Sequence, residues 1–226
     1  MLGGGGVKGE EKGILLVGGA CGIVTGAFVV AGLGVALTLT PSLPWTTEQS
    51  LVNFPKNETA ILTSYRLAYI ASLLFIVFLV GLYRAARKTQ PAAALIATAF
   101  GIVAAALTLV NFLVGLSAGF GLAQTYATAT PSNRFAVVVA AQAVQEVLSG
   151  LSAATILSVG VSFIAFGLAM RRNPDFQKAL GWVSVVLGVV VFGLLYAELS
   201  SLLAYPVIAI FAIVFGAKLV SLSRVS

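Results

Sequence analysis

The chain has 226 residues, of which 59% are hydrophobic and 9% charged, and its sequence pI is near 9.7. Water-soluble domains carry roughly a quarter charged residues, so this composition excludes a soluble globular protein and predicts a chain embedded in lipid. His is absent and Cys21 is the single cysteine. These two facts exclude His-ligated haem, ordinary zinc and copper centres, His-assisted nucleophiles and an intrachain disulfide.

The predicted elements are apolar helices of membrane-spanning length. A bilayer is crossed by about 20 apolar residues, and prolines, glycines and charges divide the chain into such stretches. Pro41 and Pro44 follow the first, and Gly119 and Gly121 are expected to end the third. We therefore expect an all-α, polytopic membrane protein with a single bundle over residues 1–226 and six transmembrane helices at about 14–39, 59–83, 91–116, 151–170, 179–197 and 202–220.

One predicted helical stretch is too long for a single crossing. Between Arg134 and Met170, a continuous helix would be about 55 Å long at 1.5 Å per residue, whereas the hydrocarbon core is about 30 Å thick. We expect a break near Gly150, which leaves an outer helix over about 134–149 that is interfacial or partly re-entrant.

The positive charges predict the topology. Loops of membrane proteins that are rich in Lys and Arg stay on the cytoplasmic side, and ten of the thirteen basic residues fall on one face of the predicted bundle. We therefore expect a multi-pass protein of a prokaryotic cell membrane with both termini cytoplasmic. Anionic lipid headgroups explain the basic charge, so no nucleic-acid partner is expected. The ten residues are Lys8, Lys12, Arg84, Arg87, Lys88, Arg171, Arg172, Lys178, Lys218 and Arg224.

Glycines in the first span predict a helix-packing seam. Gly18, Gly22 and Gly26 recur at four-residue spacing, and small residues at this spacing let two helix backbones approach closely inside a membrane. A neighbouring helix of the same bundle is the simplest partner. The alternative is another chain, either a different membrane subunit or a second copy in a homo-oligomer.

Polar residues inside the predicted spans gather in the outer leaflet and form the candidate site. Burying such groups costs several kcal/mol unless they are paired, so we expect Arg66 to form a salt bridge with Glu146 or Glu198, with Glu198 favoured. The functional hypothesis is an outward-facing pocket for a small ligand or a lipid headgroup. The alternatives are that Arg66 extends to the surface, that the pair is purely structural, or that the glutamine stripe faces water. The candidates are Arg66, Tyr69, Asn111, Gln142, Gln145, Glu146, Tyr196 and Glu198.

Two weaker patterns concern modification and bound molecules. Asn57 begins an N-glycosylation sequon with Glu58 and Thr59, in a loop that the topology places outside, so it is a candidate glycosylation site. Fourteen Phe residues at helical spacing indicate lipid contact or core packing, with a bound lipid or hydrophobic pigment as the alternative. No cofactor and no metal are predicted.

The order of motifs resembles a known family. A glycine-rich first span precedes Gly81-Leu82-Tyr83-Arg84, then Pro91-Ala92-Ala93-Ala94-Leu95, then an Arg171-Arg172 turn. This layout resembles an uncharacterised family of six-helix prokaryotic membrane proteins classed as a domain of unknown function. The resemblance implies the fold and carries no functional residue.

Three functions agree with these patterns. We expect a non-enzymatic accessory or structural subunit of a larger membrane complex, because the chain has a glycine seam, short loops and few residues suited to catalysis. The alternative is a small-solute transporter or a ligand- or lipid-binding sensor that uses the polar cluster. An enzyme acting on lipid ranks third, with Glu146 or Glu198 as its only candidate acid.

Overall fold

The fold is helical throughout the part of the chain that is described. The computed structural model describes residues 4–39, 46–195 and 200–225. These residues form α1 (Gly4–Leu39), α2 (Thr47–Lys56), α3 (Glu58–Ala86), α4 (Pro91–Thr128), α5 (Pro131–Arg171), α6 (Lys178–Leu194) and α7 (Ser200–Val225). Among these described helices, α1, α3, α4, α5 and α7 are long and apolar enough to cross a membrane, and α6 is an apolar helix of 17 residues. The predicted all-α, polytopic membrane fold is confirmed.

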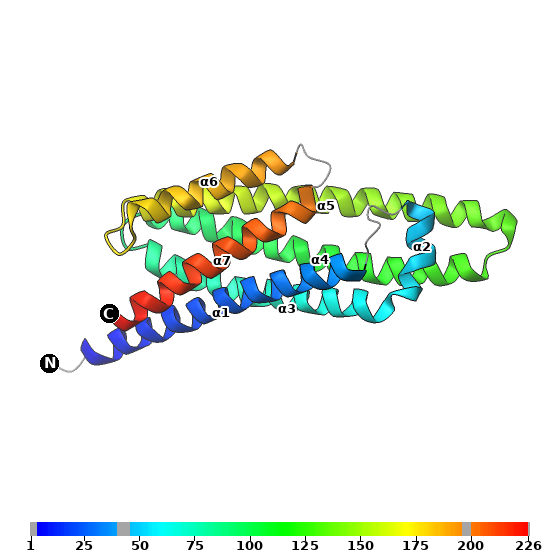
Figure 1. Ribbon diagram of the computed structural model, residues 1–226. Coiled ribbons are helices and arrows are strands. Elements are labelled where there is room, and N and C mark those ends of the chain that lie inside the picture. Colours follow the sequence, from blue (N-terminus) through cyan, green and yellow to red (C-terminus); the bar gives the residue numbers. More distant parts are fainter. Residues whose placement is uncertain (1–3, 40–45, 196–199, 226) are drawn as a thin grey trace.

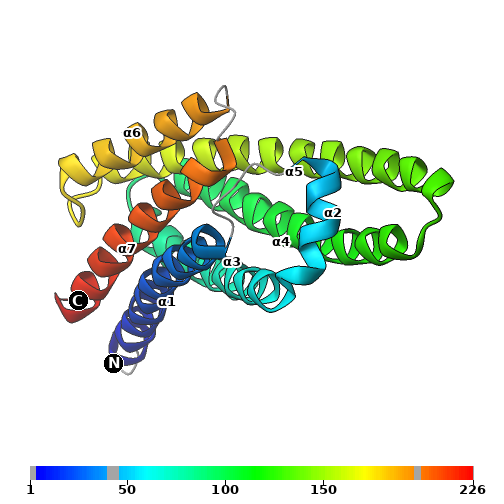
Figure 2. The same cartoon turned by 45° about the vertical axis from the view of Figure 1, so that its right-hand side comes forward.

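The long helices and α6 form a ring. Going round it, α1 packs on α3, α3 on α4, α4 on α5, α5 on α6, α6 on α7, and α7 returns to α1. The contact between α6 and α7 is the least extensive of these. Figures 1 and 2 show α1, α3 and α7 on one side of the ring and α4, α5 and α6 on the other. The centre of the ring is therefore bordered by two groups of helices.

The glycine seam of α1 lies against α3 and α7 of the same chain. A Cβ atom added at Gly18 would lie 2.8 Å from the Cα of Gly81 in α3, and one added at Gly26 would lie 2.9 Å from the Ala209 carbonyl oxygen in α7. Gly22 faces both helices at once, because its added Cβ would lie 2.6 Å from the Phe78 ring and 2.9 Å from a carbonyl oxygen of α7. Only glycine permits backbones this close, so these glycines fix how α1 sits in the ring.

Both termini lie at one end of the bundle, which we call the basic end (Figure 1). Lys88, after α3, forms ion pairs with Glu11 of α1 and Asp175 before α6, each at 3.4 Å. Partial desolvation of its ammonium group disfavours the charged form, but the two carboxylates outweigh this and raise the pKa of Lys88. Asn173 donates a 2.8 Å hydrogen bond to the Ala85 carbonyl oxygen. These contacts join the two sides of the ring at the basic end.

The opposite end is a long α4–α5 hairpin, which we call the hairpin end. The 38 residues of α4 and 41 of α5 correspond to about 57 and 62 Å at 1.5 Å per residue, roughly twice the hydrocarbon thickness. The hairpin therefore extends beyond the rest of the bundle, and α2 crosses it there (Figure 1). Leu51 of α2 is 5% exposed against the hairpin, and the Tyr126 hydroxyl of α4 donates a hydrogen bond to Glu48 of α2.

The structure corrects three sequence predictions at this end. The predicted outer helix 134–149 and span 151–170 are one continuous helix, α5, with no break at Gly150. The third span does not stop at 116, because α4 continues through Gly119 and Gly121 to Thr128. The predicted loop after the first span contains α2, which starts with a capping box between Thr46 and Gln49. The excess helix length is accommodated by projection beyond the bundle rather than by a change of direction.

Candidate functional site

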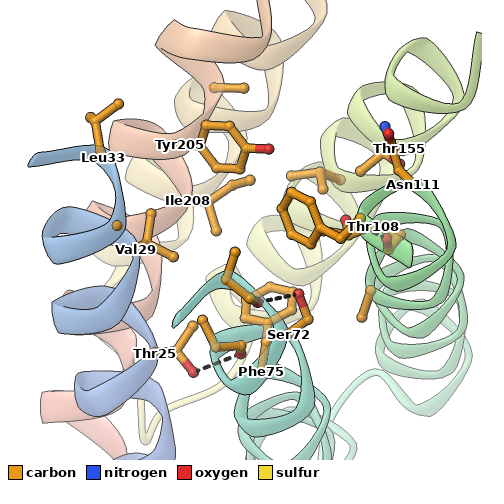
Figure 3. Close-up of a pocket in the computed structure, with 18 of the residues that line it drawn as sticks. Thr25, Val29, Leu33, Ser72, Phe75, Thr108, Asn111, Thr155, Tyr205 and Ile208 are labelled. Atoms are coloured by element: carbon orange, nitrogen blue, oxygen red, sulfur yellow. Dashed lines mark hydrogen bonds between the residues drawn. The ribbon is translucent and has the colours of Figure 1, made fainter. Parts of the chain in front are cut away.

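A cavity lies inside the ring of helices. Its volume is about 230 Å³, just below the roughly 300–1,000 Å³ of sites for drug-sized ligands. Residues of α1, α3, α4, α5, α6 and α7 line it. Figure 3 shows Val29 and Leu33 of α1 on one side, Asn111 and Thr108 of α4 on the other, and Tyr205 of α7 between them. Among the described lining residues none is charged, so the cavity suits an uncharged and mainly apolar occupant.

The cavity occupies the half of the bundle nearer the hairpin end. Along α3 its lining runs from Ser64 to Phe75. A hydrocarbon core of about 30 Å corresponds to some 20 helical residues, so a membrane that begins at Arg84 at the basic end would finish close to Ser64. The lining therefore spans the depth from about the middle of the bilayer to its far surface. An occupant would lie within one leaflet.

Buried aromatic rings fill the ring of helices on the basic side of the cavity. Phe163 of α5 stacks on Phe211 of α7 with centroids 3.7 Å apart and an interplanar angle of 12°. The ring centroid of Phe211 also lies 4.5 Å from that of Phe215 and 6.0 Å from that of Phe78 in α3. All four side chains are fully buried. Phe75, which lines the cavity and contacts Phe78, joins this cluster, and together they close the cavity on the side of the basic end.

Most hydroxyl groups of the cavity walls already donate hydrogen bonds within the protein. Thr25 of α1 donates to the Ala71 carbonyl oxygen at 3.4 Å, which ties α1 to α3. Ser64 of α3 donates in the other direction, to Gly32 of α1, at 3.2 Å. Three others bond a carbonyl one turn earlier in their own helix: Ser72, Thr108 and Thr155. The walls therefore present hydroxyl oxygens that can accept a hydrogen bond from a ligand, but few hydroxyl groups that are free to donate one.

Asn111 is the predicted site residue that the structure places in the cavity. Its Nδ2 atom donates to the Ser152 Oγ at 2.7 Å and to the Leu148 carbonyl oxygen at 3.3 Å, both in α5. Tyr69 is not among the lining residues of α3 and is 39% exposed. Asn111 thus joins α4 to α5 at the cavity wall.

The expected ion pair of Arg66 with Glu146 is not formed. Both side chains are exposed, and within the described part of the chain neither takes part in a salt bridge. Arg66 lies about 27 Å along α3 from Arg84 at 1.5 Å per residue, near the far edge of the hydrocarbon layer, where an arginine can reach water or headgroups. The favoured partner, Glu198, and the candidate Tyr196 lie outside the described residues.

The glutamine stripe of α5 lies on the projecting part of the hairpin rather than at the cavity. Gln142, Gln145 and Glu146 are exposed. The Gln145 Oε1 atom accepts a 3.2 Å hydrogen bond from the Thr47 hydroxyl, which helps to hold α2 on the hairpin. Asn57, the candidate glycosylation site, lies between α2 and α3, and its Nδ2 atom donates to the Asn53 carbonyl oxygen at 3.0 Å.

Comparison with known proteins identifies the family of the chain. A family model described as a domain of unknown function, DUF4386, matches residues 13–222. The chain belongs to the DUF4386 family. No curated protein and no solved structure matches it. The DUF4386 match covers most of α1 and of α7 and everything between them. Every residue that lines the cavity therefore lies in the family region.

The cavity of this DUF4386 protein includes residues that the sequence analysis did not select. Tyr65 of α3 and Tyr205 of α7 line it, and the Tyr65 ring contacts Phe112 edge-on with centroids 5.3 Å apart. A pattern in the sequence could have pointed to this face of α3, because small and hydroxyl side chains recur there at helical spacing. They are Ser64, Tyr65, Ala68, Ala71 and Ser72.

Proposed function

We propose that this DUF4386 protein is a non-enzymatic, ligand-binding protein of a prokaryotic cell membrane, and that its ligand is a small, uncharged and mainly apolar molecule. The observation that carries the proposal is the cavity of about 230 Å³, which is lined by six helices and has no charged side chain among its described lining residues. Small uncharged molecules that dissolve in the bilayer have the required chemistry. Because the cavity lies within one leaflet, such molecules can be drawn from the bilayer itself.

The orientation is part of the proposal. The basic end carries most of the Lys and Arg residues, and loops with this excess remain in the cytoplasm. The termini are then cytoplasmic and the hairpin end is external. In this orientation the cavity lies in the outer leaflet, and the aromatic cluster around Phe211 separates it from the cytoplasmic half of the bundle.

Gly32 offers a substitution that fills the cavity with little strain. It lines the cavity, and a Cβ atom added there would lie 3.8 Å from its nearest neighbours, an ordinary van der Waals distance. Gly34 is the matched control, because it lies on the exposed side of α1 and an added Cβ would meet nothing within 4 Å. Leucine at either position adds the same side chain to the same helix.

Native mass spectrometry of the purified protein tests the proposal. We expect a bound small molecule on the wild type and on Gly34→Leu, and its loss from Gly32→Leu. A wild-type protein without a bound molecule would contradict the proposal. So would a molecule that binds all three proteins equally, because it would then occupy the lipid-facing surface.

A second candidate function is that of an accessory or structural subunit of a larger membrane complex. The exposed apolar side chains on the projecting part of α5 favour it: Phe135 is 76% exposed, Val139 46% and Val147 59%. A partner docked on this face should be released by Phe135→Glu and retained by Thr128→Glu, an exposed position at the end of α4. Purification without a stoichiometric partner would remove this candidate.

A further inference from the structure

Two tyrosine hydroxyls are unused hydrogen-bond donors of the cavity, besides the hydroxyl of Ser152, which accepts a hydrogen bond from Asn111. Neither the Tyr65 nor the Tyr205 hydroxyl has a hydrogen-bond partner among the residues that the structure describes. Both side chains are half-buried, and the polar end of a tyrosine in such a position usually bonds to protein, water or a ligand. The hydroxyl of Tyr205 points across the cavity, away from α1 and towards the side formed by Thr108, Asn111 and Thr155 (Figure 3).

The two tyrosines lie at the same end of the cavity. Tyr65 is near the start of α3 and Tyr205 near the start of α7, and both starts lie towards the hairpin end. The Tyr65 hydroxyl oxygen reaches the α4 backbone, 3.2 Å from the position of a Cβ added at Gly115. By contrast, the opposite end of the cavity is lined by apolar groups such as Phe75, Val159 and Val191, and the hydroxyls there, of Thr25 and Ser72, already donate to backbone carbonyl oxygens. An occupant would therefore place its polar group near the tyrosines and its apolar part near the middle of the membrane.

The walls favour a flat molecule. Aromatic rings come from four helices, and aromatic rings stack favourably on other flat rings. The rings belong to Phe28, Tyr65, Phe75, Phe112 and Tyr205. With two donors to offer and no charge among the described lining residues, the cavity matches a neutral ring compound whose oxygen accepts hydrogen bonds.

We propose that the ligand is an uncharged ring compound with a carbonyl oxygen, of the quinone class, and that the Tyr65 and Tyr205 hydroxyls donate hydrogen bonds to that oxygen. This inference rests on the proposed function, since it names the ligand class of the same cavity. It also assigns distinct roles to neighbouring residues of α3. Tyr65 lines the cavity, whereas Tyr69, one turn later, does not line it and is 39% exposed.

The test compares two probes that carry the same decyl chain on a six-membered carbon ring, one with two carbonyl oxygens on the ring and one with none. Decylbenzoquinone has the carbonyl groups and decylbenzene lacks them. Calorimetric titration into the detergent-solubilised full chain, with empty micelles subtracted, gives the affinity of each probe for the wild type and for Tyr65→Phe, Tyr205→Phe and Tyr69→Phe. Each change removes a hydroxyl group and keeps the ring.

A single hydrogen bond contributes about 0.5–1.5 kcal/mol, so Tyr65→Phe and Tyr205→Phe should each weaken quinone binding by about two- to tenfold. Decylbenzene binding should be unchanged in both, and Tyr69→Phe should change neither probe. Equal quinone affinity in the wild type and both cavity variants would overturn this inference and leave the proposed function intact. Failure of both probes to bind the wild type, or binding of both to Gly32→Leu at wild-type affinity, would overturn the proposed function as well.

Discussion

Adding one methyl group at Gly22 should destabilise the bundle, although the same change at Gly34 of the same helix should not. The added Cβ would lie 2.6 Å from the Phe78 ring and 2.9 Å from the Ala212 carbonyl oxygen. Carbon atoms in contact lie about 3.5–4.0 Å apart, so α1 and its neighbours must separate by about 1 Å. Overpacking of this kind costs about 1–3 kcal/mol.

Gly34→Ala is the control for Gly22→Ala. An added Cβ at Gly34 would meet nothing within 4 Å, and replacing a helical glycine by alanine gains about 0.5–1 kcal/mol of backbone entropy. The free energy of unfolding, measured by titration with a denaturing detergent, should therefore fall for Gly22→Ala and stay level or rise for Gly34→Ala. Equal changes in the two variants would refute the close α1–α3–α7 packing.

Three further predictions concern other contacts. Leu51→Ala should free α2 from the hairpin and speed hydrogen exchange in α2, because a large-to-small change of a buried leucine costs about 2–5 kcal/mol. Val52→Ala, at a position 41% exposed, should leave hydrogen exchange unchanged. Equal exchange rates in the two variants would contradict the packing of α2 on the hairpin. Ser162→Ala should lower the free energy of unfolding by about 0.6 kcal/mol, and by at most about 1.7 kcal/mol, because it removes the 2.7 Å hydrogen bond from the Ser162 hydroxyl to the Ala97 carbonyl oxygen of α4. A more stable variant would show that this hydrogen bond does not stabilise the bundle. Lys88→Met should lower the free energy of unfolding by up to about 1 kcal/mol at neutral pH. Because the pKa of Lys88 is raised above 10.5, the stability that its ion pairs add is present below pH 10.5 and is lost as the pH rises through the higher pKa of the folded state. A difference from the wild type that persists at more alkaline pH would exclude the ion pairs as its cause.

The sequence predicted the fold class because membrane helices leave a direct record in apolar length and charge. It failed where glycine was treated as a helix breaker. A glycine inside a helix costs about 1 kcal/mol relative to alanine, and packing can recover this. At Gly119 the missing side chain makes room for Phe54 of α2, since an added Cβ would lie 2.6 Å from its ring. At Gly121 and Gly150 an added Cβ would meet nothing within 4 Å, so α4 and α5 continue through these glycines without a packing partner there.

The cavity could not be predicted because it depends on how each helix is rotated about its axis. Arg66 was selected for the cost of burying its charge, yet Tyr65, one residue earlier, is the one that faces the cavity. Consecutive helical residues point about 100° apart, so choosing between them requires knowing which neighbours surround α3. Asn111 was found because an amide in a membrane helix is costly wherever it points.

The most direct test of ligand binding in the cavity is photoaffinity labelling in native membranes with an alkyl diazirine probe. Labelled peptides from the wild type and from Gly32→Leu are compared by mass spectrometry. We predict label at cavity positions of α3 and α4, such as Ser72 and Thr108, in the wild type and its loss in Gly32→Leu, while label at the exposed Leu73 and Val110 persists in both. Identical labelling of the two proteins would contradict a ligand inside the ring of helices.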